Sequence, residues 1–429
     1  MFYKPRTWQP WVFWMIAIIA LFVSYAWFSN FQSVGLEHFQ VHVVDSADYR
    51  FVAEHFWGIA HDYRTYAPEF SSDWGAYLST VPFREIGIGT FYLAFTRVVG
   101  LNQNLIPLFL QMCFYAVYLL VFFCIWKRYN PFVALICLLV LLSPKLWAST
   151  GELFSEAFLR IIFLLMLSSL LWFYKEKDFV PKFIILFVLT LIASQIKSQW
   201  VLLSGIFFIC SVAVAFRAKS IKYYVLSALF LLIPVFLILM HGIGWNAWTL
   251  TVGGGLHANV KTSGSYLDTY CSEYPDNTVC DPAFEKNTWW LVRTDKAVSI
   301  SEWQHFDAQA SKYFLRDKAQ VMSDFIRGMY MATNFPAGIR GDVEFSRSPL
   351  FGAVDLFVWI VLLLGLFPRK TRYIVLFSLS LWLVPALGNV FAAYSARFIR
   401  PIAGIPLATG ILVLSVFIQP YIKSRPKSF

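Results

Sequence analysis

Long runs of apolar residues, separated by short polar connections, dominate the pattern of the chain. A membrane-spanning helix needs about 20 mostly apolar residues, and ten segments approach this length. They cover residues 10–28, 104–126, 131–146, 153–174, 180–195, 200–216, 223–242, 351–367, 373–393 and 401–419. The pattern therefore predicts an all-α polytopic membrane protein with about ten transmembrane helices.

The composition favours the same class of protein. Hydrophobic residues make up 58% of the 429 residues, charged residues only 14%, and the mean hydropathy is +0.60. A soluble domain would carry roughly 25% charged residues. The first apolar run, Trp11 to Phe28, follows Lys4 and Arg6 and lacks a small-residue cleavage site. It is therefore expected to be an uncleaved helix and not a signal peptide.

Basic residues are distributed unevenly over the connections between these segments. One set of connections, which includes Lys182 and both ends of the chain, holds sixteen Lys and Arg. Because such residues concentrate in cytoplasmic loops, this set and both termini are predicted to be cytoplasmic. The net charge of +10 then indicates membrane orientation and not nucleic-acid binding. Four cations stand in short connections on the opposite, outer side: Lys145, Lys197, Arg397 and Arg400.

Two long segments fall on the outer side, at about 29–103 and 243–350, and are expected to form small folded caps. This divides the chain into a transmembrane module over 1–242, an outer domain over 243–350 and C-terminal helices over 351–429. The stretch 82–100 is apolar but contains Arg84, Glu85 and Arg97, so it is expected to lie in the membrane interface. In "CSEYPDNTVC", Cys271 and Cys280 are expected to form a disulfide, because the outer compartment is oxidising.

Charged side chains at unusual depths are candidates for function. The four outer cations could have no role beyond extending their side chains to the lipid head groups. Alternatively, they could bind the phosphate of a lipid-linked substrate. The sequence "GELFSEAFLR" places Glu152, Glu156 and Arg160 on one helical face, where charges inside a span point to a cavity or to an ion pair that fixes packing. Asp355 is a weaker example of the same kind.

Several short motifs resemble the GT-C superfamily of integral-membrane glycosyltransferases. They are "DSADYRFVA" after the first helix, "SPKLWASTGELFSEAF", "SQIKSQW", and "YSARFIRPIAGIP" before the last helix. The layout is most similar to bacterial enzymes that modify lipopolysaccharide O-antigen, including serotype-converting glucosyltransferases. The chain lacks the Trp-Trp-Asp motif of oligosaccharyltransferases, since "TWWLV" has no Asp after the Trp pair. Protein N-glycosylation is therefore not expected.

This resemblance implies transfer of glucose or another hexose from a polyprenyl-phosphate donor to a lipid-linked glycan in the periplasm of a bacterial inner membrane, with inversion. Asp45 is the first candidate for the base that accepts the acceptor proton, and Asp48 is the second; either could instead cap a helix. The donor phosphate would bind Arg397, Arg400, Lys197 and Lys145. The substrate cavity would include Tyr49, Glu152, Glu156, Arg160 and Tyr394. The resemblance implies no definite cofactor; His55 and His61 could bind a divalent metal together with these acids, but a metal is not favoured.

Two other functions remain open. An O-antigen polymerase or ligase would use outer Arg and His residues and a lipid diphosphate donor, without an acid in the first outer loop. A transporter or flippase of polyprenyl-linked glycans would place charges at the bilayer midplane, often within two similar halves. The outer position of the charges and the absence of a visible repeat favour the glycosyltransferase.

Overall fold

The structure is a computed structural model. It describes residues 9–32, 44–66, 78–79, 84–102, 105–142, 155–172, 179–250, 257–259, 262, 265–281, 284–286, 291–293, 299–329, 349–368, 370–391 and 401–423. Each of the ten predicted apolar segments overlaps helix within the described residues. The helices are α1 (Gln9–Gln32), α5 (Ile106–Arg128), α6 (Pro131–Leu141), α8 (Ser155–Trp172), α9 (Val180–Ile196), α10 (Leu202–Ala218), α11 (Ile221–Ala228) with α12 (Leu232–Trp245), α17 (Pro349–Leu364), α18 (Arg372–Phe391) and α19 (Ile405–Lys423).

Four helical stretches among the described residues are long and apolar enough to cross a membrane: Ile106–Arg128, Ser155–Trp172, Ser198–Ala218 and Ile221–Trp245. The remaining apolar helices are shorter by this measure. The chain is therefore helical and consistent with a multi-pass membrane protein, while the number of ten spans stays a prediction. Most of the buried apolar residues form one cluster, to which α5, α6 and α8 contribute many members.

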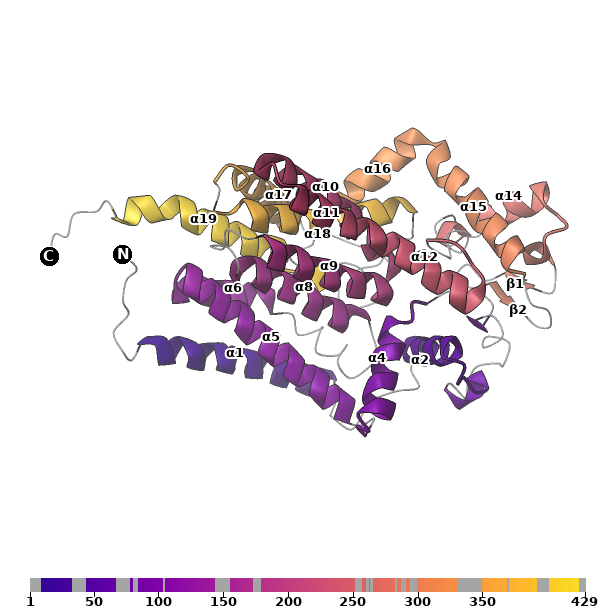
Figure 1. Cartoon of the computed structure of the whole chain (residues 1–429), viewed down its shortest axis with the longest axis horizontal. Helices are drawn as coiled ribbons and strands as arrows, with labels where there is room; N and C mark the ends of the chain where they lie inside the picture. Colours follow the sequence, from indigo (N-terminus) through magenta and orange to yellow (C-terminus); the bar gives the residue numbers. More distant parts are fainter. Residues whose placement is uncertain are drawn as a thin grey trace.

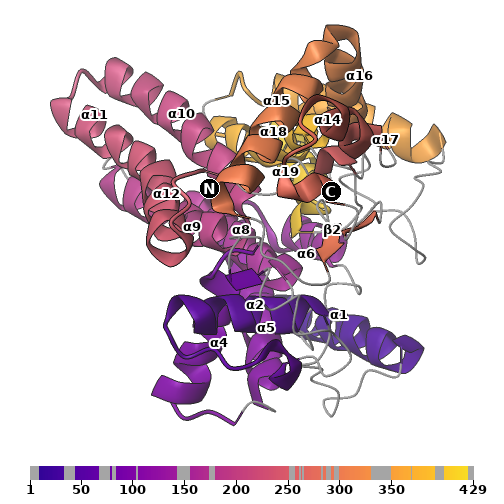
Figure 2. The same cartoon turned by 90° about the vertical axis from the view of Figure 1, so that its right-hand side faces the viewer.

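The long helices run roughly along one axis of the molecule (Figure 1). The beginning of α1 and the end of α19 lie at one end, and the elements of both predicted outer segments lie toward the other (Figure 1). In the view turned by 90°, α2 and α4 lie in the lower part of the picture and α14 to α16 in the upper part (Figure 2). Elements far apart in sequence therefore gather at one end of the bundle.

The described part of the first outer segment contains short helices. They are α2 (Val44–Phe56), the 3-10 turn η1 (Tyr63–Thr65), α4 (Gly87–Leu93) and the π-helical turn η2 (Ala94–Val98). A small apolar cluster joins Val52 of α2 and Tyr63 of η1 to Trp245 at the end of α12. The described part of the interfacial stretch is thus a short helix followed by a π turn, and it does not reach the length of a span.

The second outer segment has an apolar cluster of its own, which includes Tyr266, Trp303 and Phe306. Its elements are α14 (Ser265–Glu273), η7 (Thr278–Cys280), β1 (Phe284–Lys286), β2 (Leu291–Arg293), α15 (Ile300–Arg316) and α16 (Lys318–Met329). Cys271 and Cys280 form a disulfide. The antiparallel β1–β2 ribbon was not expected from the sequence; its aromatic and β-branched residues suit a strand, but each strand is only three residues long.

Candidate active site

A buried acid on α2 forms the centre of the candidate site. Asp48 is fully buried. One carboxylate oxygen accepts a hydrogen bond from the Tyr63 hydroxyl at 2.7 Å, and the other accepts from the Arg84 guanidinium at 3.3 and 3.4 Å. The Arg84 guanidinium also lies 5.3 Å from the centre of the Tyr49 ring. A buried carboxylate needs such partners, so Asp48 holds Arg84 at the surface of α2.

Glu54, the second buried acid of α2, has a different set of partners. It forms an ion pair with Arg50 at 2.9 Å, one helical turn earlier, and accepts a hydrogen bond of 2.5 Å from the Tyr66 hydroxyl. Burial, and next the hydrogen bond to Glu54, raise the pKa of Tyr66 to about 12. Tyr66 therefore remains a donor at neutral pH. These bonds attach the segment around η1 to α2.

The dipeptide Arg84–Glu85 connects α2 to α12. Arg84 pairs with Asp48, whereas the Glu85 carboxylate lies 3.1 Å from Nε2 of His241. Nδ1 of His241 lies 2.9 Å from the Thr249 carbonyl oxygen. Since a carbonyl oxygen only accepts, Nδ1 carries a proton and donates it. Two adjacent residues thus anchor the first outer segment to two different helices through buried polar contacts.

Two glycines set the position of α4 between α2 and α9. A Cβ atom at Gly89 would overlap the Tyr49 carbonyl oxygen and come within 2.5 Å of the Ala53 Cβ, both on α2. A Cβ atom at Gly87 would come within 2.5 Å of the Gln195 carbonyl oxygen near the end of α9. Glycine at both positions therefore allows α4 to touch both helices closely. The acid of α2 and Lys197, which ends α9, are thereby brought to the same region.

His257, from the second outer segment, joins this region. Burial, and next the nearby positive charges of Lys197 and Arg84, lower the pKa of His257 to about 4. The imidazole is therefore neutral at physiological pH. The described part of the site thus combines a buried carboxylate, two cations and a neutral histidine, drawn from four separate stretches of the chain.

Arg160, which was expected in the substrate cavity, lies in the packed interior. It is fully buried, and its guanidinium donates to the carbonyl oxygens of Pro401 at 3.1 Å, Ala403 at 2.7 Å and Leu141. Its Nε also lies 3.3 Å from the Tyr118 hydroxyl oxygen. These contacts join α8 to the end of α6 and to the approach to α19. This arrangement is that of a residue that fixes helix packing.

The other expected site residues are placed to different extents. Glu156 is buried and accepts a hydrogen bond of 3.3 Å from the Ser155 hydroxyl, and Tyr49 is buried beside Arg84. Asp45 lies in the first turn of α2, three residues before Asp48. The side chain of Asp45 lies outside the described residues, as do the whole of Lys145, Glu152, Tyr394, Arg397 and Arg400. Their roles stay predictions.

No cluster of three His, Cys, Asp or Glu residues that could hold a metal occurs in the described part of the chain. His55, which was considered as a ligand, packs its ring near those of Phe51 and Trp245. Metal dependence remains untested. Arg84, Tyr63, His241 and His257 were not predicted as site residues. The signal present in the sequence was the set of charges that interrupts the apolar stretch 82–100.

No protein-family model matches the chain, and no curated protein sequence matches it significantly. Two solved structures resemble it. One is the archaeal oligosaccharyltransferase AglB from Archaeoglobus fulgidus in complex with an inhibitory peptide and a dolichol-phosphate, with 11% identity, a TM-score of 0.46 and coverage of 98% of this chain and 52% of that chain. The other is an Archaeoglobus fulgidus oligosaccharyltransferase in complex with Zn and sulfate, with 11% identity, a TM-score of 0.43 and coverage of 95% and 49%. The chain thus spans about half the length of these structures, at an identity where residue roles do not transfer.

Proposed function

We propose that the chain is a membrane glycosyltransferase that moves a sugar from a polyprenyl-phosphate donor to a lipid-linked glycan on the outer side of the membrane. The observation that carries this proposal is the ion pair between Arg84 and the buried Asp48 of α2, with Lys197 and His257 near Arg84. An acid beside cations at one end of an apolar helical bundle suits chemistry on a lipid phosphate at the membrane surface. We propose a hexose such as glucose as the sugar and an O-antigen-type glycan of the bacterial inner membrane as the acceptor.

In this reaction a hydroxyl of the acceptor attacks the anomeric carbon of the donor sugar. The new bond joins the acceptor oxygen to that carbon, the bond from the carbon to the phosphate oxygen breaks, and a carboxylate takes the hydroxyl proton. We assign the carboxylate to Asp45. Positions 45 and 48 lie on one face of α2 because they are three residues apart in a helix, and both oxygens of Asp48 already accept hydrogen bonds. One displacement inverts the anomeric centre.

The cations would stabilise the leaving polyprenyl phosphate. Arg84 is held by Asp48 and is about one-fifth exposed, so its guanidinium can still meet a ligand. Lys197 is half-buried. Its positive charge contributes to the lowered pKa of His257, which supports placing the two side chains in one region. A neutral His257 can donate a hydrogen bond to a phosphate oxygen without adding a third positive charge. The other three outer cations that the charge pattern singled out, Lys145, Arg397 and Arg400, would complete this phosphate site.

The test is transfer of radiolabelled sugar from a polyprenyl-phosphate donor to a lipid-linked acceptor by the purified protein in detergent. Asp45→Asn should lower turnover by roughly 10²–10⁴-fold without changing thermal stability, because it removes only the proton acceptor. Asp48→Asn should lower both turnover and stability, because it weakens the ion pair with Arg84. Full turnover by folded Asp45→Asn, with loss confined to Asp48→Asn, would move the base to Asp48. Absence of transfer by the wild type from every donor would reject the enzyme class.

One observation also favours a second candidate, an O-antigen polymerase or ligase. Such an enzyme was expected to rely on outer Arg and His residues, and His257 lies near both Arg84 and Lys197. It would consume a lipid diphosphate donor and transfer a whole glycan. The two activities are therefore separated by the donor that the purified protein consumes and by the mass added to the acceptor.

A further inference from the structure

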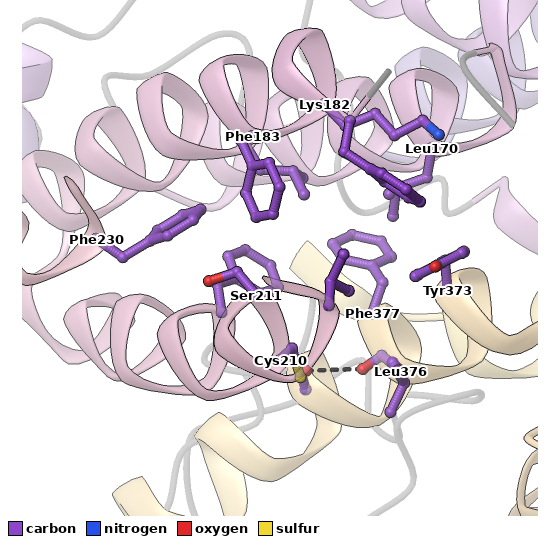
Figure 3. Close-up of a pocket in the computed structure, with 14 residues that line it drawn as sticks. Leu170, Lys182, Phe183, Cys210, Ser211, Phe230, Tyr373, Leu376 and Phe377 are labelled. Carbon is purple, nitrogen blue, oxygen red and sulfur yellow. Dashed lines mark hydrogen bonds between the residues drawn. The ribbon is translucent and has the colours of Figure 1, made fainter. Parts of the chain in front are cut away.

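A largely apolar, partly open pocket lies among α8, α9, α10 and α18. Figure 3 shows aromatic side chains around it, with Lys182 and Tyr373 toward one end and Phe230 toward the other. Phe207 and Phe377 form part of its walls. The cavity is partly open, so a ligand could enter it from the surrounding membrane.

The polar end of the cavity is predicted to face the cytoplasm. Lys182 lies in the first turn of α9 and Tyr373 in the first turn of α18, and both helices follow connections that the charge pattern assigns to the cytoplasmic side. Ser380 lies seven residues after Tyr373, which is about 10 Å along a helix. The cavity therefore extends from the level of the cytoplasmic lipid head groups about one-third of the way through the hydrocarbon core.

A cation lines the mouth of this otherwise apolar space. Lys182 is only 9% exposed, and its Nζ lies 4.5 Å from the centre of the Phe179 ring. Aromatic faces attract a cation, and Lys182 lies toward one end of the cavity. A phosphate at the mouth would meet this positive charge, while an acyl chain would cover the aromatic walls. The cavity is thus complementary in both charge and polarity to a lipid with an anionic head group.

We propose that an anionic phospholipid of the cytoplasmic leaflet binds here, with its phosphate on Lys182 and the first part of one acyl chain in the cavity. Basic pockets between helices on the cytoplasmic side commonly bind such head groups. The polyprenyl donor is a less suitable occupant, because the cavity is short and Lys197 of the candidate active site lies at the opposite end of α9, about 22 Å away along the helix. The bound lipid would join α9, α10 and α18 and stabilise the folded bundle.

The test uses the delipidated full-length protein in detergent, titrated with phosphatidylglycerol or with phosphatidylcholine of the same acyl chains. Bound lipid is counted by native mass spectrometry, and the thermal midpoint is measured in parallel. The wild type should bind phosphatidylglycerol more tightly and be stabilised more by it. Lys182→Gln should lower the affinity for phosphatidylglycerol about tenfold or more, with little change for phosphatidylcholine. The matched control Lys222→Gln, at an exposed lysine outside the cavity, should keep the wild-type preference.

Filling the cavity provides an independent measurement. Ser211→Phe and Val214→Phe each add a ring to the lining and should reduce the binding of both lipids. The lipid binding of a variant is compared with that of the wild type only if the variant is folded without lipid, as judged by its thermal midpoint. One such variant is enough for the test. The proposal is overturned if Lys182→Gln keeps the preference for phosphatidylglycerol, or if a folded cavity-filling variant binds it like the wild type. It is also overturned if the lipid that copurifies in this site has the mass of a polyprenyl phosphate.

Discussion

Gly89→Ala tests whether the close contact of α4 with α2 positions the candidate site. The added Cβ would lie 2.5 Å from the Ala53 Cβ, where ordinary contacts begin at 3.4 Å, and would overlap the Tyr49 carbonyl oxygen. The two helices must therefore separate by at least about 0.9 Å. Overpacking of this kind costs about 1–3 kcal/mol. Arg84 precedes α4 by three residues, so the shift also carries its guanidinium away from Asp48, at present 3.3 Å distant.

The expected result is a free energy of unfolding lowered by about 1–3 kcal/mol and turnover reduced by about 100-fold, since a displacement of 1 Å in an active site has such an effect. Unfolding is followed in detergent, and sugar transfer is measured at a temperature where both proteins are folded. Gly205→Ala is the matched control: no atom lies within 4 Å of its added Cβ, and a helical Gly replaced by Ala gains about 0.5–1 kcal/mol. Gly89→Ala with wild-type stability and turnover would refute the positioning role.

Three further predictions concern other parts of the structure. Arg160→Lys should lower the free energy of unfolding by about 1–3 kcal/mol, because one ammonium cannot reach all the carbonyl oxygens that the guanidinium reaches. Sugar transfer by the folded variant should stay near the wild-type rate. A large loss of sugar transfer without a loss of stability would place Arg160 at the substrate. Thiol labelling of denatured, unreduced protein should spare Cys271 and Cys280, and labelling of both would exclude the disulfide. The pKa of His257 is lowered to about 4, so the stability that its neutral imidazole contributes is complete above pH 6.5 and is lost as the pH falls toward 4. His257→Gln should therefore weaken the acid destabilisation of the protein measured between pH 7 and pH 5. An unchanged pH dependence would contradict the burial of a neutral imidazole.

The sequence predicted features that depend on local pattern. The apolar runs located the helices because a helix that faces lipid must be apolar along its length. The acidic stretch after the first helix was identified as a candidate site, and it forms α2 with the buried Asp48. The disulfide was predicted from two cysteines nine residues apart, and the structure contains it. Each of these inferences needed only neighbouring residues and their expected compartment.

Features that depend on distant contacts could not be predicted in the same way. Glu156 and Arg160 have the spacing of a helical ion pair, yet the Arg160 guanidinium donates to carbonyl oxygens more than 240 residues later in the chain. Arg84 meets Asp48 across 36 residues. The sequence alone does not indicate that position 89 requires glycine, because this requirement comes from the close contact of α4 with α2. Local periodicity sets which face of a helix is apolar, but not which other helix that face meets.

The buried charges of the first outer segment explain why an acid can persist in so apolar a chain. Arg84 pairs with a carboxylate of α2, and Glu85 pairs with an imidazole of α12. In one pair the dipeptide supplies the basic partner, and in the other it supplies the acidic partner. Removal of one partner would leave a buried charge uncompensated, which costs more than the intact pair contributes. The pairs therefore favour one position of α2 over nearby alternatives. That position holds Asp48 beside Arg84, whose charge acts together with that of Lys197 on His257, in the region where the proposed reaction needs an acid.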